Sequence, residues 1–406
     1  MQDNEKKPAL RFKGFTDPWE QRKFGEVVDK YEDPVETPHD GYYRLGIRSH
    51  AKGTFHSYVE KGHELETAQM YRVAAGNFIV NITFGWEHAV AITNESDAGK
   101  LVSHRFPQYS FHDDMLPEFF KYVIADEDFR HWLWLASPGG AGRNRVLKLD
   151  EMLNYEMVLP SKEEQQRIAA IFCNLDTLIT LHQRKYEKLV NIKKSMLDKM
   201  FPQNGASVPE IRFKGFTDPW EQRKLGEIAK EVVRNDPASD APIMMITAGN
   251  GFIEQSDRYA FNNAGESLKK YILLERGELA YNHGASKLRP YGSCFALTTV
   301  EKARIPFVYH CFSVEKSNPE FLSIELNGAN VENQLRKIVS SGARMDGLLN
   351  IAYSEYTEVT VQLPKKEEQD WIAKFFKHLD TLITLHQRKL EKLQNIKKSC
   401  LEKMFV

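Results

Sequence analysis

The stretch Leu175–Lys185 reads LDTLITLHQRK, and the same eleven letters recur at Leu379–Lys389, 204 positions later. A second block, RFKGFTDPWEQRK, occupies Arg11–Lys23 and returns at Arg212–Lys224, 201 positions later. Both blocks recur in the same order, so the chain is a tandem duplication of one unit. A repeat of this kind decides the fold before any local pattern is considered.

Between the matched blocks, residues 24–158 and 225–362 diverge almost completely. The landmarks that they share are Gly76 with Gly277, and Pro117-Glu118-Phe119 with Pro319-Glu320-Phe321. Since the landmark spacing lies between the spacings of the two blocks, we expect both variable segments to share one fold. The blocks are identical in both copies while the segments between them differ. This contrast favours one shared task for the blocks and two different tasks for the variable segments. Recent gene conversion of the blocks is the alternative explanation.

Each copy ends in a predicted long helix. Ser161 stands three residues before Glu164, which predicts a capping box at the start of the first helix. Pro202 forbids its continuation, so we expect about 40 residues, or ~60 Å at 1.5 Å per residue. The second helix is predicted from about Lys366 to Met404, with a weaker cap because Lys365 replaces the serine.

Both predicted helices carry a heptad seam, in which steps of three and four alternate. The first seam consists of Phe172, Leu175, Ile179, His182, Tyr186, Leu189, Lys193, Met196 and Met200. The second consists of Phe376, Leu379, Ile383, His386, Leu390, Leu393, Lys397, Cys400 and Met404. Two matching seams favour packing of one helix on the other. The two seam histidines, His182 and His386, could act as ligands. A polar residue in such a seam more often fixes the register in which the two helices pair.

The variable segments read as mixed α and β. Alternating apolar residues predict strands at 155–159 and 359–363, just before each long helix. Further strands are predicted at Phe78–Ile82 and Ala89–Ile92, and helices near Pro117 and near Pro319. Glycine-rich turns follow at 137–142 and 340–342.

The order of segments predicts the topology. Antiparallel helices would carry the chain from one globule to the other and back, whereas parallel helices would require the second globule to span their whole length. We therefore predict an α+β fold with two mixed α/β globules, joined by two long antiparallel coiled-coil helices with pseudo-two-fold symmetry. The predicted segments are 1–160, 161–204, 205–364 and 365–406.

Composition excludes several classes of protein. The chain has 406 residues, of which 42% are hydrophobic, so it can bury real cores. No run of 18 uncharged apolar residues occurs, and residues 1–7 are polar, so neither a membrane span nor a secretory signal is expected. Four cysteines, none in a C-x-x-C pair, argue against a zinc site or a disulfide framework and favour a reducing cytoplasm.

Catalytic signatures are missing from the sequence. The sequence contains neither G-x-x-x-x-G-K-[ST] nor G-x-G-x-x-G, the two glycine-rich motifs that bind phosphates. The H-E-x-x-H and G-x-S-x-G patterns are also absent. The asparagine–proline–proline–aromatic motif of amino-methyltransferases does not occur either. We therefore expect no catalytic residues and no bound metal in this chain.

Charge is distributed unevenly, although the net charge is only −1. Residues 161–200 hold eight basic and five acidic residues, and residues 365–406 hold ten and six. The globule segments 1–160 and 201–364 carry net charges of −6 and −2. Acidic globules weigh against nucleic-acid binding, so only local clusters of basic residues support it.

Four local clusters combine glycine with donor side chains. The candidate DNA-binding residues in these clusters are Arg44, Arg48, His50, Lys52, Arg143, Asn144, Arg145, Lys287, Arg289 and Arg344. Guanidinium and amide groups match base edges, and glycine lets the backbone approach a phosphate. Any one cluster could be an ordinary solvated loop, but clusters recur in both globules.

The blocks resemble a known family. RFKGFTDPWEQRK followed by Phe24 or Leu225 and then Gly-Glu resembles the opening of each half of a type I restriction–modification specificity subunit. The LP-x-K-E-E-Q motif before each long helix, with LDTLITLHQRK inside it, resembles that family's spacer. Tyr43–Phe55 is similar to a recurring segment of target-recognition domains. The resemblance covers nearly the whole chain.

The resemblance implies a non-catalytic subunit. In that family each target-recognition domain reads a few base pairs, and the helices set the gap between two half-sites. The implied partners are double-stranded DNA, two copies of a DNA adenine methyltransferase subunit and a motor–nuclease restriction subunit. S-adenosylmethionine, ATP and magnesium would then belong to the partners.

One alternative from another class is a two-headed adaptor that captures proteins with its variable globules. The arginine clusters would then be incidental. Steep weakening of DNA binding with salt would distinguish the two hypotheses.

Overall fold

The computed structural model describes residues 7–65, 67, 69–139, 145–203, 205–257, 265–339 and 348–405. Two compact units emerge, one formed by Met1–Gln183 with Arg388–Val406 and the other by Arg184–Gln387. Each unit therefore contains one globule and parts of both long helices.

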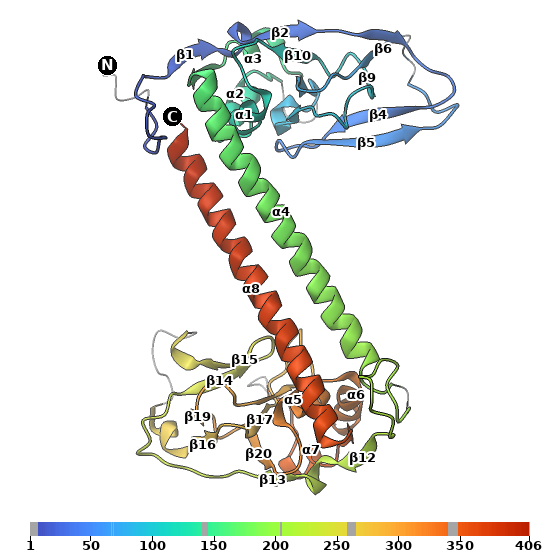
Figure 1. The fold of residues 1–406 in the computed structure, drawn as a ribbon, viewed down its shortest axis with the longest axis vertical. Coiled ribbons are helices and arrows are strands. Elements are labelled where there is room, and N and C mark those ends of the chain that lie inside the picture. The colour runs from blue at the N-terminus through green and yellow to red at the C-terminus, as the bar shows by residue number, and fades with distance from the viewer. Residues whose placement is uncertain are drawn as a thin grey trace. The chain divides into compact units, whose positions relative to one another are not determined.

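The first unit contains three sheets and three short helices (Figure 1). Its strands are β1 (Glu20–Lys23), β2 (Val28–Tyr31), β3 (Pro34–Glu36), β4 (Tyr42–Ile47), β5 (Thr54–Val59), β6 (Gln69–Arg72), β7 (Phe78–Val80), β8 (Val90–Ile92), β9 (Leu101–Val102), β10 (Gln108–Phe111) and β11 (Glu156–Leu159). Its helices are α1 (Pro117–Val123), α2 (Glu127–Leu135) and α3 (Leu149–Leu153). The sheet orders are β1-β11, β2-β10-β7-β8 and β3-β6-β9-β4-β5.

The second unit repeats part of this plan. Its strands are β12 (Glu221–Lys224), β13 (Ala229–Glu231), β14 (Met244–Thr247), β15 (Gly251–Glu254), β16 (Ile272–Glu275), β17 (Leu279–Asn282), β18 (Ser293–Ala296), β19 (Lys302–Ile305), β20 (His310–Val314) and β21 (Thr360–Leu363). Its helices are α5 (Pro319–Leu326), α6 (Ala329–Ile338) and α7 (Tyr353–Tyr356). The sheet orders are β12-β21, β13-β20-β17-β18, β14-β15 and β16-β19.

The central four-stranded sheets correspond strand for strand, as expected for variable segments that share one fold. Gly76 and Gly277 precede β7 and β17 with φ angles of 79° and 89°. A Cβ atom at either glycine would lie 3.7 Å or 4.0 Å from the ring of Pro117 or Pro319, which begins α1 or α5. The shared landmarks are thus one packed turn, found in both units.

The strands and helices predicted around these landmarks are confirmed, with β7 and β8 shorter than expected. Asn318 caps α5 by accepting a hydrogen bond from the Phe321 amide, 3.0 Å away.

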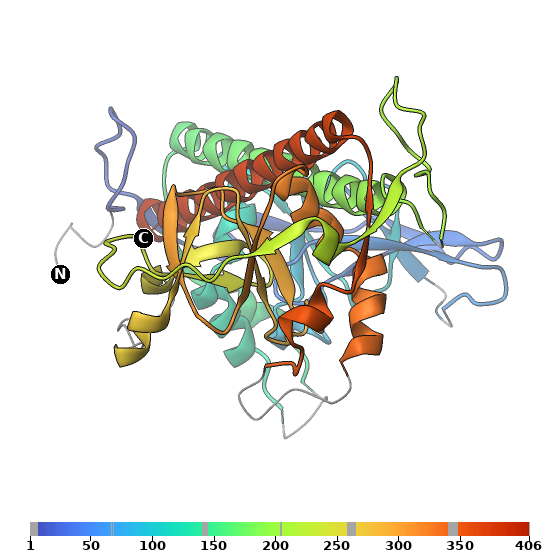
Figure 2. The same ribbon diagram turned by 90° about the horizontal axis from the view of Figure 1, so that it is seen from below.

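Two helices are much longer than the others (Figure 1 and Figure 2): α4 (Lys162–Lys199, 38 residues) and α8 (Lys366–Met404, 39 residues). In the first unit, Lys397 Nζ lies 2.6 Å from Asp176 Oδ1. In the second unit, Lys193 pairs with Asp380. The duplication relates these two contacts, because each residue of one pair is the counterpart of a residue in the other. The start of one helix lies beside the end of the other in both units, so the predicted antiparallel pairing is confirmed.

The end of each long helix packs into a globule core. Phe405 follows α8 and stacks on Phe119 at 5.5 Å between ring centroids, with an interplanar angle of 21°. Phe201 follows α4 and stacks on Phe321 at 5.7 Å and 20°. The duplicated sequence therefore makes the same aromatic contact twice, once in each unit.

The start of each long helix is held by a buried ion pair. Glu164 is 1% exposed and accepts two hydrogen bonds from Arg11, at 2.8 and 2.7 Å, and one from Trp19 Nε1, at 3.1 Å. Glu368 accepts two bonds of 2.7 Å from Arg212. We call these two groups the clamps. Each clamp joins the first repeated block to the helix start, which gives the identical letters a structural task.

The clamp corrects the predicted capping box. Ser161 Oγ does accept a long bond of 3.5 Å from the Glu164 amide. The Glu164 carboxylate does not return to Ser161, because it binds the guanidinium of Arg11 instead. An ionised arginine is the stronger donor to a carboxylate, so the ion pair replaces the reciprocal half of the cap.

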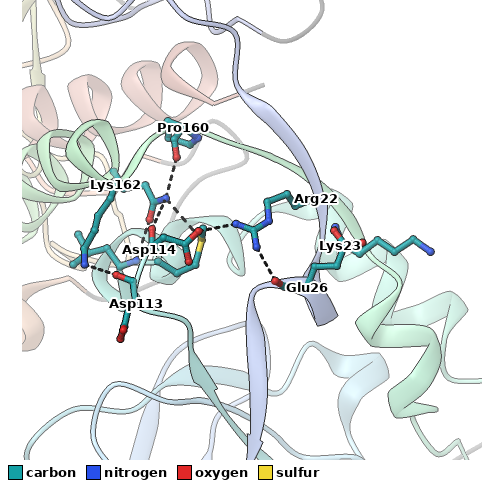
Figure 3. Close-up of polar contacts among 10 residues, drawn as sticks. Arg22, Lys23, Glu26, Asp113, Asp114, Pro160 and Lys162 are labelled. Atoms are coloured by element: carbon teal, nitrogen blue, oxygen red, sulfur yellow. Dashed lines mark hydrogen bonds and ion pairs between the residues drawn. The ribbon is translucent and has the colours of Figure 1, made fainter.

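Figure 3 shows how the start of α4 is tied to the chain before α1. Gln165 Nε2 donates to the Pro160 carbonyl at 3.0 Å, and its Oε1 accepts from the Leu116 amide at 3.0 Å. Lys162 Nζ donates to the Asp113 carbonyl, and Arg22 Nη1 donates to Asp114 Oδ2 at 2.8 Å. The first strand, the loop before α1 and the helix start are thereby fixed together.

Every position of the two predicted seams is buried or half-buried. Phe172 is buried in α4 and Met200 is buried directly after it, and Phe376, Leu379, Leu390 and Met404 are buried in α8. The other seam positions, including His182 and His386, are half-buried.

Candidate nucleic-acid interface

Strands β4 and β5 form a hairpin that carries four of the predicted DNA-binding residues. Arg44 lies on β4 and is half-buried, whereas Arg48, His50 and Lys52 are exposed in or beside the turn at 48–53. The structure thus brings these four side chains together on one supersecondary element.

Backbone hydrogen bonds hold the turn of this hairpin. The amides of His50 and Ala51 donate to the carbonyls of Glu87 and His88, each at 2.9 Å. His50 and Ala51 have φ angles of 62° and 48°, which are unfavourable for residues with a Cβ atom. Such strain persists only where the surroundings enforce it, and it gathers at functional sites. These contacts fix the backbone of the turn that carries the exposed side chains of His50 and Lys52.

The support beneath the turn is itself buried. Burial lowers the pKa of His88, which keeps its imidazole neutral. His88 Nε2 lies 2.6 Å from the carbonyl oxygen of Ile124, which can only accept, so this nitrogen carries the hydrogen. The hairpin turn is thus linked through His88 to the end of α1.

An exposed phenylalanine lies across β4. Gly46 faces Phe55 in the strand register, and a Cβ atom at Gly46 would lie 2.3 Å from the Phe55 ring. The Arg48 guanidinium lies 5.2 Å from the centroid of the same ring, which is a cation–π distance. Glycine at position 46 is therefore needed to seat the ring beside the arginines.

Exposed aromatic residues also lie on this hairpin, and they were not among the residues predicted to bind DNA. Tyr43 and Tyr58 face each other across it, with ring centroids 5.0 Å apart, and Lys100 Nζ lies 5.7 Å from the Tyr43 ring. Alternation along Tyr42–Ile47 would place Tyr43 on the same face as buried Leu45 and Ile47, so the sequence does not mark it as exposed. In the structure Tyr43 is 56% exposed.

A pocket of about 470 Å³ opens between the hairpin and residues 81–87. Its lining includes Arg44, Phe55, Asn81, Phe84, Glu87 and Phe106. Aromatic walls with a few polar groups are the usual composition of a ligand site.

A second cation–aromatic pair lies near the end of α2. The Arg145 guanidinium lies 4.7 Å from the ring centroid of Trp134, and the His131 ring stacks on the same indole at 6.1 Å. Arg143 and Asn144, predicted in the same cluster, lie outside the described residues.

The second unit arranges its cluster differently. Lys287 is exposed, but Arg289 is half-buried and donates through Nη1 to the Asn327 carbonyl at 2.7 Å. Burial lowers the pKa of Arg289 from its usual value. Arg289 therefore anchors residues 284–289 to the end of α5. Arg344 lies outside the described residues.

Within the described ranges, no group of three or more histidine, cysteine, aspartate or glutamate side chains has the geometry of a metal site. No described helix has the length and hydropathy needed to cross a bilayer.

The comparisons with known proteins point in one direction. Residues 17–191 match the sequence profile of the type I restriction modification DNA specificity domain. This match covers the first globule and most of α4, and the repeated blocks of the second half lie beyond it.

The fold resembles that of a solved specificity subunit along nearly the whole chain. The S subunit of a type I restriction–modification system from M. genitalium has a TM-score of 0.57 at 12% identity, over 98% of this chain and 99% of that one. The HsdS subunit from Thermoanaerobacter tengcongensis has a TM-score of 0.42 at 17% identity, over 95% and 96%. The first of these two likenesses supports the fold.

Proposed function

The chain belongs to the type I restriction–modification specificity subunit family, and from this premise we propose that it reads a bipartite, asymmetric DNA site. Residues 1–160 and 205–364 act as the two target-recognition domains, and residues 161–204 and 365–406 act as spacer helices. The observation that carries the proposal is the duplicated frame with two different outer surfaces. Equal frames with unequal surfaces serve two half-sites of different sequence.

Direct reading of bases is assigned to the basic clusters. In the first globule Arg44, Arg48, His50, Lys52 and Arg145 contact DNA, together with the flanking Arg143 and Asn144. In the second globule Lys287 and Arg344 contact DNA, and Arg289 orders the loop. Arginine forks suit base edges in the major groove, while lysine neutralises phosphates. The support is that the described cations of the first hairpin share one rigid element with exposed aromatic rings.

The helices are proposed to hold two copies of a methyltransferase subunit. Between residues 177 and 194 of α4, eleven positions are exposed, and only Val190 differs from its counterpart in α8. The half-buried seam changes in the same interval, where Tyr186 is replaced by Leu390. Surfaces usually drift faster than cores, so this exposed identity indicates a constraint outside the chain.

The start of each helix shows the ordinary pattern. Its buried residues Ile168, Ala169 and Phe172 are identical in both copies. Apart from Lys162 and Glu163, which recur as Lys366 and Glu367, its exposed residues differ, as in Arg167 and Trp371. The contrast within one helix supports a partner surface confined to the middle, used twice by the same partner.

We expect no catalysis from this chain alone. S-adenosylmethionine, ATP and magnesium act in the partner subunits, and a motor–nuclease subunit joins the complex where restriction occurs. The subunit works in the cytoplasm, where its DNA lies.

The test of DNA specificity begins with co-expression of the chain and the methyltransferase encoded beside it. Methylated adenines are then mapped across the host genome. The expected result is a split motif with a constant gap. Replacing residues 24–158 by another variable segment should change one half of the motif and leave the other unchanged. A continuous motif, or a change in both halves, would overturn the proposal.

The test of the scaffold uses the duplicated leucines Leu181 and Leu385, each 44% exposed. Leu181→Glu and Leu385→Glu should each leave one methyltransferase copy bound, and the double variant none, by native mass spectrometry. Val190→Glu, at the one exposed position that differs, is the matched control and should keep two copies. Two copies bound to the double variant would contradict the assigned surface.

A further inference from the structure

The pocket beside β4 has features that readout of a stacked duplex does not need. It is enclosed by the hairpin on one side and by residues 81–87 on the other, and its volume is about 470 Å³. A side chain that only touches a groove edge requires no cavity. The pocket has room for a planar ring system with its sugar.

Two phenylalanines form the walls. Phe55 and Phe84 are each 41% exposed, and both line the pocket. Within the described residues they make no ring contact with each other, and both rings border the pocket. The Phe55 ring packs over Gly46, and its tip fills the space that a side chain at position 46 would occupy. Aromatic faces of this kind stack on nucleobases whatever their sequence.

The polar groups of the pocket have unused hydrogen-bonding capacity. The Arg44 side chain makes no hydrogen bond or ion pair within the described residues, although it is half-buried. Asn81 Oδ1 accepts from the Thr83 amide at 3.0 Å, which leaves its NH₂ group without a partner in the same ranges. Neither side chain has a fully buried unpaired donor, so these donors stay accessible from the pocket and can bind the acceptors of a ligand.

An acidic group narrows the class of ligand. Glu87 lines the pocket, and its Oε2 accepts a hydrogen bond of 2.7 Å from Ser49 Oγ. A carboxylate disfavours a phosphate and favours an N–H group. Donors from Arg44 and Asn81, an acceptor from Glu87 and aromatic walls together match the edge and the faces of a nucleobase.

We propose that this pocket binds one nucleobase turned out of the target DNA, with Phe55 and Phe84 stacking on the base and Arg44, Asn81 and Glu87 reading its edge. The inference rests on the proposed function as a DNA specificity subunit. Turning a base out of the stack costs unpairing energy, and least where the pair is already mismatched. The stacking and edge contacts in the pocket offset that cost.

The experiment uses the assembled complex with the methyltransferase and the DNA motif from the methylation map. Each base pair of the first half-site is replaced by a mismatch that keeps one original base, and the Kd is measured. At one position other than the methylated adenine pair, where the methyltransferase itself turns out a base, the mismatch should tighten binding by about tenfold, since unpairing no longer opposes extrusion. Phe84→Leu and Phe55→Leu keep apolar bulk but remove the aromatic face. Both should weaken binding of the matched site by about tenfold.

Phe307→Leu is the matched control, because Phe307 is an exposed aromatic residue of the second unit. It should leave the mismatch gain at the first half-site unchanged. The proposal is overturned if no position other than the methylated adenine pair shows a gain, or if both pocket variants bind as the wild type does. It is also overturned if Arg44→Gln weakens all DNA equally and lowers the salt slope, which would indicate a phosphate contact. A split methylation motif would persist in each of these cases, so the proposed function would stand.

Discussion

The two clamps have identical letters but unequal hydrogen bonds. In the first unit Glu164 accepts from both Arg11 and Trp19, whereas in the second Glu368 accepts from Arg212. Trp220 Nε1 is buried and has no partner within the described residues. The same sequence block thus builds the same joint twice, while the globule around it decides how well its polar groups are satisfied.

The outer strands differ far more than the clamps. The first unit adds a five-stranded sheet that ends in the β4–β5 hairpin, and the second adds two separate two-stranded sheets. The two units therefore differ most in the outer sheets, where a DNA-binding surface is proposed. The four-stranded sheet is common to both units. Each comparison between equivalent positions becomes an internal control.

The largest effect is expected at the clamps. Glu164→Ala leaves Arg11 nearly buried and without its carboxylate, so the free energy of unfolding of the first unit should fall by about 3–5 kcal/mol. Glu368→Ala should lower the stability of the second unit by about 2 kcal/mol less, because one bond to the carboxylate fewer is lost. Urea unfolding with hydrogen exchange read separately in β11 and β21 measures both.

Glu163→Ala is the control for this pair, since Glu163 is exposed at the neighbouring position of α4. It should change stability by less than about 0.5 kcal/mol. If Glu163→Ala and Glu164→Ala lowered the free energy of unfolding equally, the clamp would contribute no more to stability than an exposed glutamate.

The second-largest expected difference between the two units is in how their stability depends on pH. Burial raises the pKa of Glu325 on α5 to about 7, and its carboxylate accepts from the Gln362 amide at 3.0 Å. Between the unfolded value of about 4.5 and pH 7, the folded state keeps a proton that the unfolded state has lost. The free energy of unfolding therefore falls as the pH rises through this window, by about 3 kcal/mol in all.

Glu325→Gln keeps an acceptor for the Gln362 amide but cannot ionise. Its stability advantage over the wild type should be near zero below pH 4.5 and should grow to about 3 kcal/mol above pH 7. Taking the difference between the two proteins removes the contributions of the buried histidines. The first unit has Val123 at the equivalent position, so its hydrogen exchange should not follow this trend. A constant difference across the pH range would refute the assignment.

The repeat made the frame predictable from sequence. Two long helices with a shared central block, separated by globules, favoured the antiparallel pairing, and the Asp176–Lys397 and Asp380–Lys193 contacts follow it. The short strands and helix starts near Pro117 and Pro319 were equally accessible, because turn and cap residues mark them locally.

The clamp and the pocket were not predictable. Glu164 lies 153 positions from Arg11, and no local pattern announces that their side chains meet. The local capping signal instead suggested a bond back to Ser161. In the same way, Phe84 and Phe55 come together only through the docking of the 48–53 turn on residues 87–88. Tertiary contacts between distant segments are the information that a single sequence lacks.

The tryptophans of the clamps give a smaller, sharper difference. Trp19→Phe removes the N–H donor to Glu164 as well as part of the ring, whereas Trp220→Phe removes ring volume and a donor that has no partner in the described residues. A hydrogen bond to a charged group is worth about 1.5–3 kcal/mol. Trp19→Phe should therefore destabilise its unit by about 2 kcal/mol more than Trp220→Phe, in the same unfolding and exchange measurements. Equal losses would mean that the indole bond contributes nothing.

The smallest difference is expected where the long helices meet. Asp176 accepts from Lys397 at 2.6 Å and from the Tyr122 hydroxyl at 2.8 Å, and burial together with this bond raises the pKa of Tyr122. Asp380 pairs with Lys193 and is more exposed than Asp176. Exposed ion pairs contribute about 0–1 kcal/mol and are screened by salt. Asp380→Asn should thus cost a few tenths of a kcal/mol and lose that effect in 1 M salt, while Asp176→Asn should cost about 1 kcal/mol and retain most of it. If salt abolished both effects alike, the phenol bond in the first unit would have no energetic role, and the two helix ends would be equivalent.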